Sequence, residues 1–525
     1  MSGMFDTKTD KASRKLAVTQ KEAKAKRKSR IISISVISVL IVFSAAAILI
    51  NSGFIRRTVP VVTIDGVNFN AAEIEYYFNS EYMEYINMMS QFQGMGMSLP
   101  EAGRPLSGQI YNHETGETWA DVILSSTLSR LVTMVNLYNA ATASGFTLSD
   151  ERLADIEAEL SMVEMQAVFN DFPSTNSLLQ QMYGSSMNVD VYRKIMNFTT
   201  VAWSYNEHVR ESFTYSSTEL DNFYLENKND LDVFSFRMLF VAAAEHDYSD
   251  FDSDEAYEKA TETAIAEAYE RAENIILGGI DSAEAFIALA QVEAGFASEW
   301  VGAVQNIMGE ELDENIAEWF LDETRRYGDI VQFNESTGST IMYFVGRDNN
   351  NYHTVGMRQI LMLRDDVNSE DFAEGIFDPG YIEAVEQAER DLHARAEQVN
   401  ALFTATGETE DALIGLMSDH SDDTTPGGEY TNIAKHSYQS SHLSVMKVVP
   451  EIEDWLFAEN RAVSDTELVY TEAYGYHLLY FTGFGELLFE LMADDRMRTR
   501  DHSEWSQSLV PGVPVKRTAF ILVHM

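Results

Sequence analysis

Hydrophobic and polar positions along this chain change period several times, and each change indicates a different predicted element. Residues 31–50 contain no charged side chain, and twenty such residues just span the core of a bilayer as a helix. Val59–Ile64 alternates and predicts a strand, and Asp65-Gly66 is a turn signal. Asn70, with Glu73 three residues later, is typical of a capping box that opens a helix.

A helical period then dominates a long stretch of the chain. Residues 118–230 are almost wholly helical by this criterion, and an amphipathic helix over 217–234 closes the stretch. The pattern therefore predicts a helical domain over residues 58–233.

From Phe234 onward the pattern predicts strands and helices in one order, and that order occurs twice. Each unit reads as a strand, two helices, a loop, a short helix and a strand. The first unit comprises residues 234–243, 254–276, 282–293, 314–323 and 340–346. The second comprises residues 355–364, 379–404, 409–418, 451–460 and 476–483.

Residue matches support this internal repeat. The aligned segments are Ile316–Trp319 with Ile452–Trp455, Gly338–Gly346 with Gly475–Gly483, and Arg237–Phe240 with Arg358–Leu361. We therefore predict two β-α-α-loop-α-β domains, at 234–349 and 353–485. A tail over 486–525 begins helical and ends in the strand-like sequence TAFILVH.

The distribution of charge separates the residues before the apolar run at 31–50 from those after it. Residues 1–30 carry ten Lys or Arg and three Asp or Glu, a net charge of +7, so the whole-chain charge of −46 leaves −53 for the rest. A basic segment before an apolar run favours a cytoplasmic N-terminus. We expect a single-pass cell-membrane anchor at 31–50, with the bulk of the chain extracellular. A cleaved signal peptide is the alternative, because Ser44–Ala47 offers small residues for cleavage.

Composition excludes several classes of function. The 525 residues suffice for two to four domains, and the absence of cysteine excludes disulfides, thiolate metal sites and cysteine nucleophiles. A net charge of −46 argues against nucleic-acid binding. Asp250, Asp252 and Asp254 alternate as in a calcium loop, but Glu255 stands where that loop needs glycine. We expect no metal and no cofactor.

The second unit resembles the parvulin family of peptidyl-prolyl isomerases. The order of its motifs carries the resemblance, which covers about 130 residues. The motifs are Arg358–Leu361, Ser421–Asp423, Gly427–Glu429, Val449–Glu453 and Tyr474–Leu479. The resemblance implies rotation about X-Pro bonds, without a cofactor, in an apolar pocket beside a polar network.

The segment before the repeats resembles the helical chaperone domain of secreted foldases of the SurA and PrsA type. Its opening VTIDGV and the later STELDNFYLEN carry that resemblance. The fold class we expect is α+β and multidomain. It comprises an N-terminal transmembrane helix, a SurA-like helical domain and two tandem parvulin-like domains, the first of them degenerate.

The parvulin resemblance implies a site in the second unit. His477 takes the place of the family's second histidine, and Asp423 that of its Cys or Asp. Gln359 stands where the first histidine is usual, and an amide cannot exchange protons as an imidazole does. The substrate-binding positions are Val448, Ile452 and Phe457.

The first unit lacks these groups. Thr340 stands at the position of His477, and Met238 at that of Gln359. A binding or spacer role is therefore expected for this unit.

Two functions compete at this point. One is a membrane-anchored extracytoplasmic foldase, a peptidyl-prolyl isomerase and chaperone for exported polypeptides with X-Pro bonds. The other is a holdase chaperone in which both units only bind. Gln359 favours the second, whereas Asp423 and His477 favour the first. A surface adhesin or solute receptor is a third class, and it would not predict this order of motifs.

Overall fold

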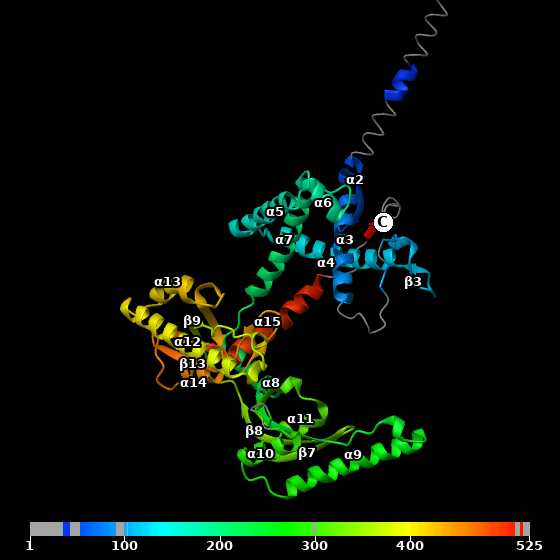
Figure 1. Ribbon diagram of the computed structural model, residues 1–525. Helices are drawn as coiled ribbons and strands as arrows, with labels where there is room; N and C mark the ends of the chain where they lie inside the picture. Colours follow the sequence, from blue (N-terminus) through cyan, green and yellow to red (C-terminus); the bar gives the residue numbers. More distant parts are fainter. Residues whose placement is uncertain are drawn as a thin grey trace, which may run out of the picture. The chain divides into compact units, whose positions relative to one another are not determined.

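The computed structural model describes residues 35–41, 53–90, 99–101, 103–296, 298, 301–509 and 515–517. Helices and small antiparallel sheets form two compact units (Figure 1). The helical unit holds the described residues up to Phe213 and those from Asp501 onward, and the sheet unit runs from Thr214 to Arg500. The predicted α+β multidomain class is confirmed at this level. The finer domain boundaries stay predictions.

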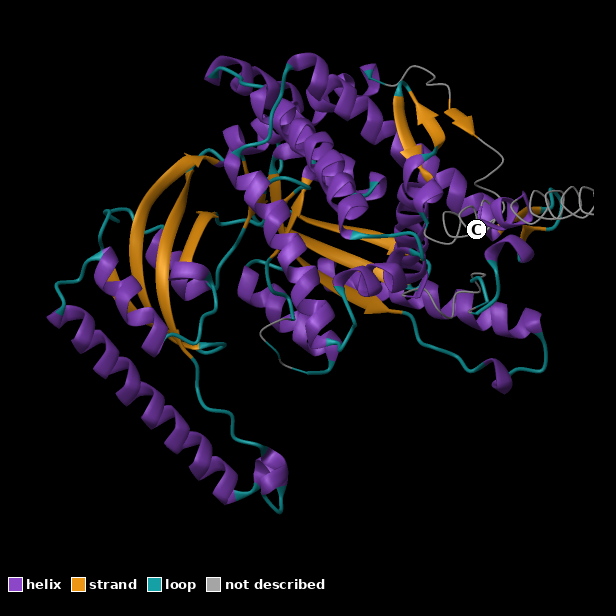
Figure 2. Ribbon diagram, turned by 90° about the horizontal axis from the view of Figure 1, so that it is seen from above, coloured by secondary structure: helices purple, strands orange, loops and turns teal. Residues whose placement is uncertain are grey.

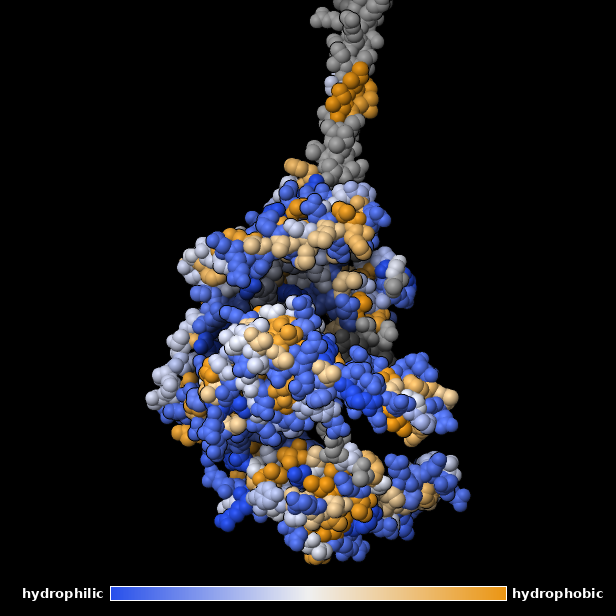
Figure 3. Space-filling model, turned by 60° about the vertical axis from the view of Figure 1, so that its left-hand side comes forward, coloured by the Kyte–Doolittle hydropathy of each residue, from blue (hydrophilic) through white to orange (hydrophobic). Residues whose placement is uncertain are grey.

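Most of the expected anchor, and all of the basic segment at 1–30, lie outside the described residues. Residues 35–41 are described, and they form a helix whose exposed apolar side chains include Val36, Leu40 and Ile41 (orange in Figure 3). Within the described part of the chain, no helix is both long and apolar enough to cross a membrane.

The helical unit begins with a short helix and a hairpin. Its elements are α2 (Phe54–Thr58), β1 (Pro60–Ile64), β2 (Val67–Asn70), α3 (Ala71–Ser90), β3 (Ile110–Asn112), β4 (Glu117–Thr118), α4 (Trp119–Ser144), α5 (Asp150–Phe169), α6 (Thr175–Tyr183) and α7 (Val189–Ser212). The turn between β1 and β2 is Asp65-Gly66, both with positive φ (40° and 83°). Two such residues match the twist of a hairpin, so the predicted turn is confirmed.

The capping box at the start of α3 is also confirmed. The backbone N–H of Glu73 donates to the Asn70 side chain at 3.0 Å, and the N–H of Asn70 donates to the Glu73 carboxylate at 2.7 Å. These bonds satisfy donors that a helix N-terminus would otherwise leave unpaired. The helices then bury one apolar core with the hairpin, in which Ile64, Ile74 and Leu131 are fully buried.

The last described strand closes this unit. Strand β15 (Val515–Arg517) pairs antiparallel with β1, placing Val515 opposite Ile64 and Arg517 opposite Val62. The sheet order is β15-β1-β2, so β1 is its central strand. Helix α15 (Leu488–Ser508) precedes β15 in the chain. The strand-like sequence TAFILVH, residues 518–524, lies outside the described residues.

The sheet unit opens with α8 (Ser217–Leu231) and contains two four-stranded antiparallel sheets, drawn in orange in Figure 2. The first sheet and its helices comprise β5 (Val233–Ala242), α9 (Asp254–Leu277), α10 (Ala283–Ala294), β6 (Gln305–Met308), α11 (Glu314–Phe320), β7 (Ile330–Glu335) and β8 (Gly338–Asp348). The second set comprises β9 (His353–Met362), α12 (Pro379–Ala405), α13 (Glu410–His420), β10 (Glu429–Ile433), β11 (Tyr438–Gln439), β12 (Ser444–Val445), α14 (Pro450–Leu456), β13 (Thr466–Thr471) and β14 (Gly475–Leu487).

The two sheets share one topology. Their strand orders are β6-β5-β8-β7 and β10-β9-β14-β13, which correspond strand for strand. In each, the two long helices cover one face: Phe286 of α10 lies in the core of the first, and Phe403 of α12 in that of the second. The short helix covers the other face, through Phe320 of α11 and Ile452 of α14.

Individual side-chain contacts of the first sheet also recur in the second sheet. Arg325 lies over the Trp319 ring at 4.3 Å, and Arg461 lies over the Trp455 ring at 3.9 Å. Each arginine donates to the backbone carbonyl of its own tryptophan. Likewise Arg237 donates to a glycine carbonyl in the first sheet, and Arg358 does so in the second.

The sequence pattern missed some strands. Strands β6, β7, β10 and β13 fall in segments for which neither a strand nor a helix was predicted, and each has four to six residues. So short a run seldom completes a recognisable alternation. Their pairing with the long central strands makes them part of the sheets.

Candidate functional site

The candidate site lies on the face of the second sheet that α14 covers. Successive side chains of a strand point to opposite faces, so Met357, Gln359 and Leu361 of β9 share one face. The next strand, β14, places Leu479 opposite Gln359 and His477 opposite Leu361. Two buried polar side chains, Gln359 at 6% exposure and His477 at 3%, thus sit side by side.

A chain of hydrogen bonds joins the three predicted polar residues. The Gln359 Nε2 donates to Asp423 Oδ2 at 2.8 Å. The Gln359 Oε1 faces His477 Nδ1 at 2.8 Å, and His477 Nε2 faces Thr471 Oγ1 at 3.0 Å. The structure therefore brings Asp423, Gln359 and His477 together, and it adds Thr471.

This series of hydrogen bonds fixes the tautomer of His477. Because the Gln359 amide donates its N–H to the Asp423 carboxylate, its oxygen faces the imidazole and can only accept. His477 Nδ1 therefore carries the hydrogen, and Nε2 accepts from the Thr471 hydroxyl. Burial lowers the pKa of His477 to about 4, although Asp423 and Glu451 oppose that shift. The imidazole is neutral at pH 7, and both of its nitrogens are hydrogen-bonded to protein groups.

Asp423 carries the negative charge of the network. Burial alone would raise its pKa, but hydrogen bonds from the Thr425 N–H, Gln359 and the Tyr430 hydroxyl hold the pKa below its usual value. The Tyr430 hydroxyl lies 2.8 Å from Asp423 Oδ2. The carboxylate is therefore ionised and fully engaged by neutral donors.

Loop geometry brings Asp423 to the sheet. The Asp422 N–H donates to the Leu361 carbonyl at 2.8 Å, so the loop continues the pairing of β9 beyond β10. Gly428 then passes so close to β9 that an added Cβ would lie 2.4 Å from the Gln359 carbonyl oxygen. With φ at +56°, only glycine fits there without strain.

An apolar cavity of about 270 Å³ adjoins this network. Of the predicted substrate-binding residues, Val448 and Ile452 line it, together with Gln359 and His477. Phe457 is not among the lining residues and instead contacts the Tyr352 ring at 5.9 Å. The reason is helical geometry, because a residue five positions beyond Ile452 points about 140° away from it.

Sequence reasoning did not assign seven other lining residues to the site. Met357 and Leu361 could have been found from the strand period, since they alternate with Gln359. Val449 and Tyr474 belong to motifs already recognised in the sequence, Val449–Glu453 and Tyr474–Leu479. The remaining three, Tyr430, Met446 and Lys447, stand at positions with no signal of their own.

The first sheet lacks this network. At the equivalent place Thr340 donates to the Glu335 carboxylate at 2.6 Å, and Met238 stands at the position of Gln359. No imidazole is present at these two positions. The chemistry of the second site is therefore not repeated.

The lining of the second site combines apolar side chains with one polar wall. Its described lining holds no serine, threonine or cysteine that could act as a nucleophile. Across the described residues, no group of three or more His, Asp or Glu side chains could hold a metal ion. The site offers an apolar cavity with one polar wall whose hydrogen bonds have fixed directions.

Comparison with known proteins adds little. No protein-family model matches the sequence, and a search of curated proteins finds no match. Among solved structures, the crystal structure of PrsA from Bacillus subtilis matches with a TM-score of 0.15 and 11% identity. The match covers 54% of this chain and 86% of that chain. A TM-score this low supports no conclusion about fold or function.

Proposed function

We propose that this chain is an extracytoplasmic foldase that isomerises X-Pro bonds in exported polypeptides, and that its second sheet carries the site. The observation that carries the proposal is the cavity of about 270 Å³ lined by Val448 and Ile452 against the His477–Gln359–Asp423 hydrogen-bond chain. The order of parvulin-like motifs around these residues supports it. The proposed domains are a helical chaperone domain at 58–233, a degenerate parvulin-like domain at 234–349 and a parvulin-like domain at 353–485.

Isomerisation of an X-Pro bond requires neither a cofactor nor a covalent intermediate. Amide resonance sets a barrier of roughly 18–20 kcal/mol to rotation, and uncatalysed X-Pro turnover takes tens to hundreds of seconds. A pocket that excludes water and holds the proline ring favours the twisted amide, in which resonance is lost. Val448 and Ile452 would hold the ring. The polar wall formed by Gln359, His477 and Asp423 would orient the carbonyl.

A proline-limited refolding assay with the full chain tests this proposal. His477→Ala removes the imidazole that donates to the Gln359 oxygen, so we expect at least a tenfold loss of the added refolding rate, as for the loss of a preorganised polar group. Thr340→Ala is the matched control, since Thr340 occupies the equivalent place in the first sheet. Equal acceleration by the wild type, His477→Ala and Thr340→Ala would exclude catalysis at this site.

A holdase without catalysis is the second candidate. One observation favours it: both nitrogens of His477 are already bonded to protein groups, so the imidazole has no proton to offer a substrate. A holdase would suppress aggregation of an unfolded client and leave the rate of proline isomerisation unchanged. Light scattering and the refolding assay, run on one preparation, separate the two functions.

The proposed location is the cell membrane. A single anchor at 31–50 would hold the N-terminus in the cytoplasm and the acidic bulk outside. The charge-free run and the +7 segment before it support this topology. Protease added to intact cells should digest the bulk of the chain but spare a tag at the N-terminus. Protection of the whole chain would contradict the proposal.

A further inference from the structure

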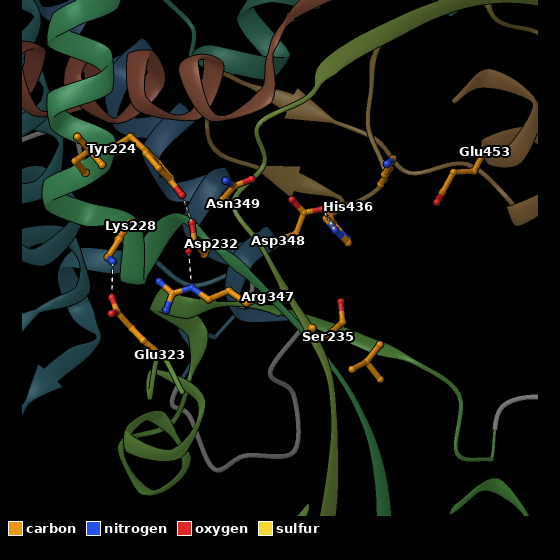
Figure 4. A pocket seen from close by; sticks show the side chains of 14 residues that line it. Tyr224, Lys228, Asp232, Ser235, Glu323, Arg347, Asp348, Asn349, His436 and Glu453 are labelled. Atoms are coloured by element: carbon orange, nitrogen blue, oxygen red, sulfur yellow. Dashed lines mark hydrogen bonds and ion pairs between the residues drawn. The ribbon is translucent and has the colours of Figure 1, made fainter. Parts of the chain in front are cut away.

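A second and larger hollow lies within the sheet unit. It is a polar cleft of about 830 Å³, lined by the end of α8, the end of β8 and two segments of the second repeat (Figure 4). We call it the junction cleft. It is distinct from the proline cavity, and the lining residues of the two do not overlap.

Most charges in the junction cleft neutralise one another. Its lining contains two ion pairs, which are Lys228 with Glu323 at 2.6 Å and Arg347 with Asp232 at 2.6 Å, and His436 is hydrogen-bonded to Asp348 at 3.1 Å. Lys435 is held over the rings of Tyr352 and Phe457 at 5.1 and 5.5 Å. These groups shape the walls and leave little net charge for a ligand.

Glu453 is the exception. Its Oε2 atom is buried and has no hydrogen-bond partner, and its ion-pair partner Lys447 lies 3.9 Å away. Burial raises the pKa of Glu453, although Lys447, His436 and Lys435 oppose that shift. A buried carboxylate oxygen with no hydrogen bond and only a long ion pair favours a cationic donor entering from the cleft.

The position of Glu453 connects the two hollows. It follows Ile452 directly on α14, and Ile452 lines the proline cavity while Glu453 lines the junction cleft. Lys447, which lines the proline cavity, is the ion-pair partner of Glu453. The proline cavity and the junction cleft therefore adjoin each other at α14.

We infer that the junction cleft binds a lysine or arginine side chain in the flank of an X-Pro segment, with Glu453 as its carboxylate partner. This inference rests on the proposed function, because the proline cavity would determine which flanking residue of the client faces Glu453. It identifies the clients as basic polypeptides. Charge at a larger scale agrees, because the part of the chain after residue 30 has a net charge of −53 and attracts cationic segments.

Direct binding tests the inference without relying on catalysis. Fluorescein-labelled proline peptides would carry lysine, norleucine or glutamate at successive positions on either side of the proline. Fluorescence anisotropy would then give their Kd with the full chain. We expect one position at which lysine binds about tenfold more tightly than norleucine, as for one charge-assisted hydrogen bond, and glutamate more weakly than either. Added salt should narrow the gap between lysine and norleucine.

Two variants make the test specific. Glu453→Gln keeps the shape and removes the charge, so the lysine advantage should disappear. Asp454→Asn is the matched control, because Asp454 is the next residue of α14, is exposed and does not line the cleft. Circular dichroism would establish that both variants fold.

The outcomes separate this inference from the proposed function. A lysine advantage that Glu453→Gln abolishes supports the cleft even if refolding assays show no catalysis. An equal loss in both variants would mean attraction by overall charge and would overturn the inference. The absence of any lysine advantage would overturn it as well, whatever the isomerase activity.

Discussion

At the scale of single residues, the direction of each hydrogen bond at the site follows from Asp423. The ionised carboxylate accepts from Gln359, which leaves the amide oxygen to accept from His477, and Thr471 completes the chain. One charge thus orients three neutral side chains. The polar wall of the cavity has one stable arrangement, which is what a site acting by orientation requires.

The first prediction concerns the charge state of His477. Nitrogen NMR of the imidazole should show a neutral ring with hydrogen on Nδ1 down to about pH 4, where the pKa of the buried ring lies. The unfolded chain binds its proton near pH 6.5. Stability from this group is therefore present above pH 6.5 and is lost as the pH falls towards 4.

An unfolding series between pH 7 and 4 measures the same effect. His477→Asn lacks the titrating ring, so its stability should fall less steeply over that window than that of the wild type. His442→Asn is the control, because His442 is exposed and lies outside the site. Equal slopes in all three proteins would contradict the assignment.

The sequence predicted the polar centre of the site but not its supporting residues. His477, Asp423 and Gln359 sit in recognisable motifs, so their association could be expected. Tyr430 and Thr471 could not be, because their roles arise only when β10 and β13 pair with the long strands. Phe457 was misplaced relative to the cavity because a spacing in sequence does not give a direction at the end of a short helix.

At the scale of elements, both sheets depend on close backbone approaches at the start of their last strand. An added Cβ at Gly475 would lie 2.5 Å from the Met362 carbonyl oxygen, and one at Gly338 would lie 2.4 Å from that of Val241. Both glycines also have positive φ, at +109° and +156°. The repeat therefore conserves a steric requirement as well as a strand order.

Gly475→Ala should accordingly destabilise the second sheet. We expect a loss of roughly 1–3 kcal/mol in the free energy of unfolding, from the strained φ and the clash with backbone. Gly415→Ala is the matched control: Gly415 is a helical residue of α13 with open space around its Cβ position. Alanine should stabilise that helix by up to about 1 kcal/mol. Urea unfolding followed by tryptophan fluorescence would report both, and a neutral Gly475→Ala would be inconsistent with this geometry.

At the scale of the whole molecule, the sequence indicated a repeat and a helical region but not how the chain closes. The pairing of β15 with β1 joins segments more than 400 residues apart. Local patterns carry no information about such a partner. Residues 486–525 therefore looked like a tail, although their last described strand completes the sheet of the helical unit.

Truncation tests this closure. A chain ending at residue 509 loses β15 and exposes one edge of β1, so its helical unit should be cleaved faster in limited proteolysis. A chain ending at Arg517 keeps the strand and should resist proteolysis as the full chain does. Equal cleavage of the two truncated chains would refute a stabilising role for β15. Because residues 58–234 alone lack β15, they do not form the complete sheet of the helical unit.

The β15–β1 pair also has a consequence for synthesis. A ribosome releases β1 more than 400 residues before β15, so the sheet of the helical unit cannot be completed until the intervening residues have been made. The intervening unit, from Thr214 to Arg500, has by then emerged and can fold first. A premature stop before residue 515 therefore leaves β1 without one of its two neighbours, so the synthesis of a segment distant in sequence governs whether the helical unit matures.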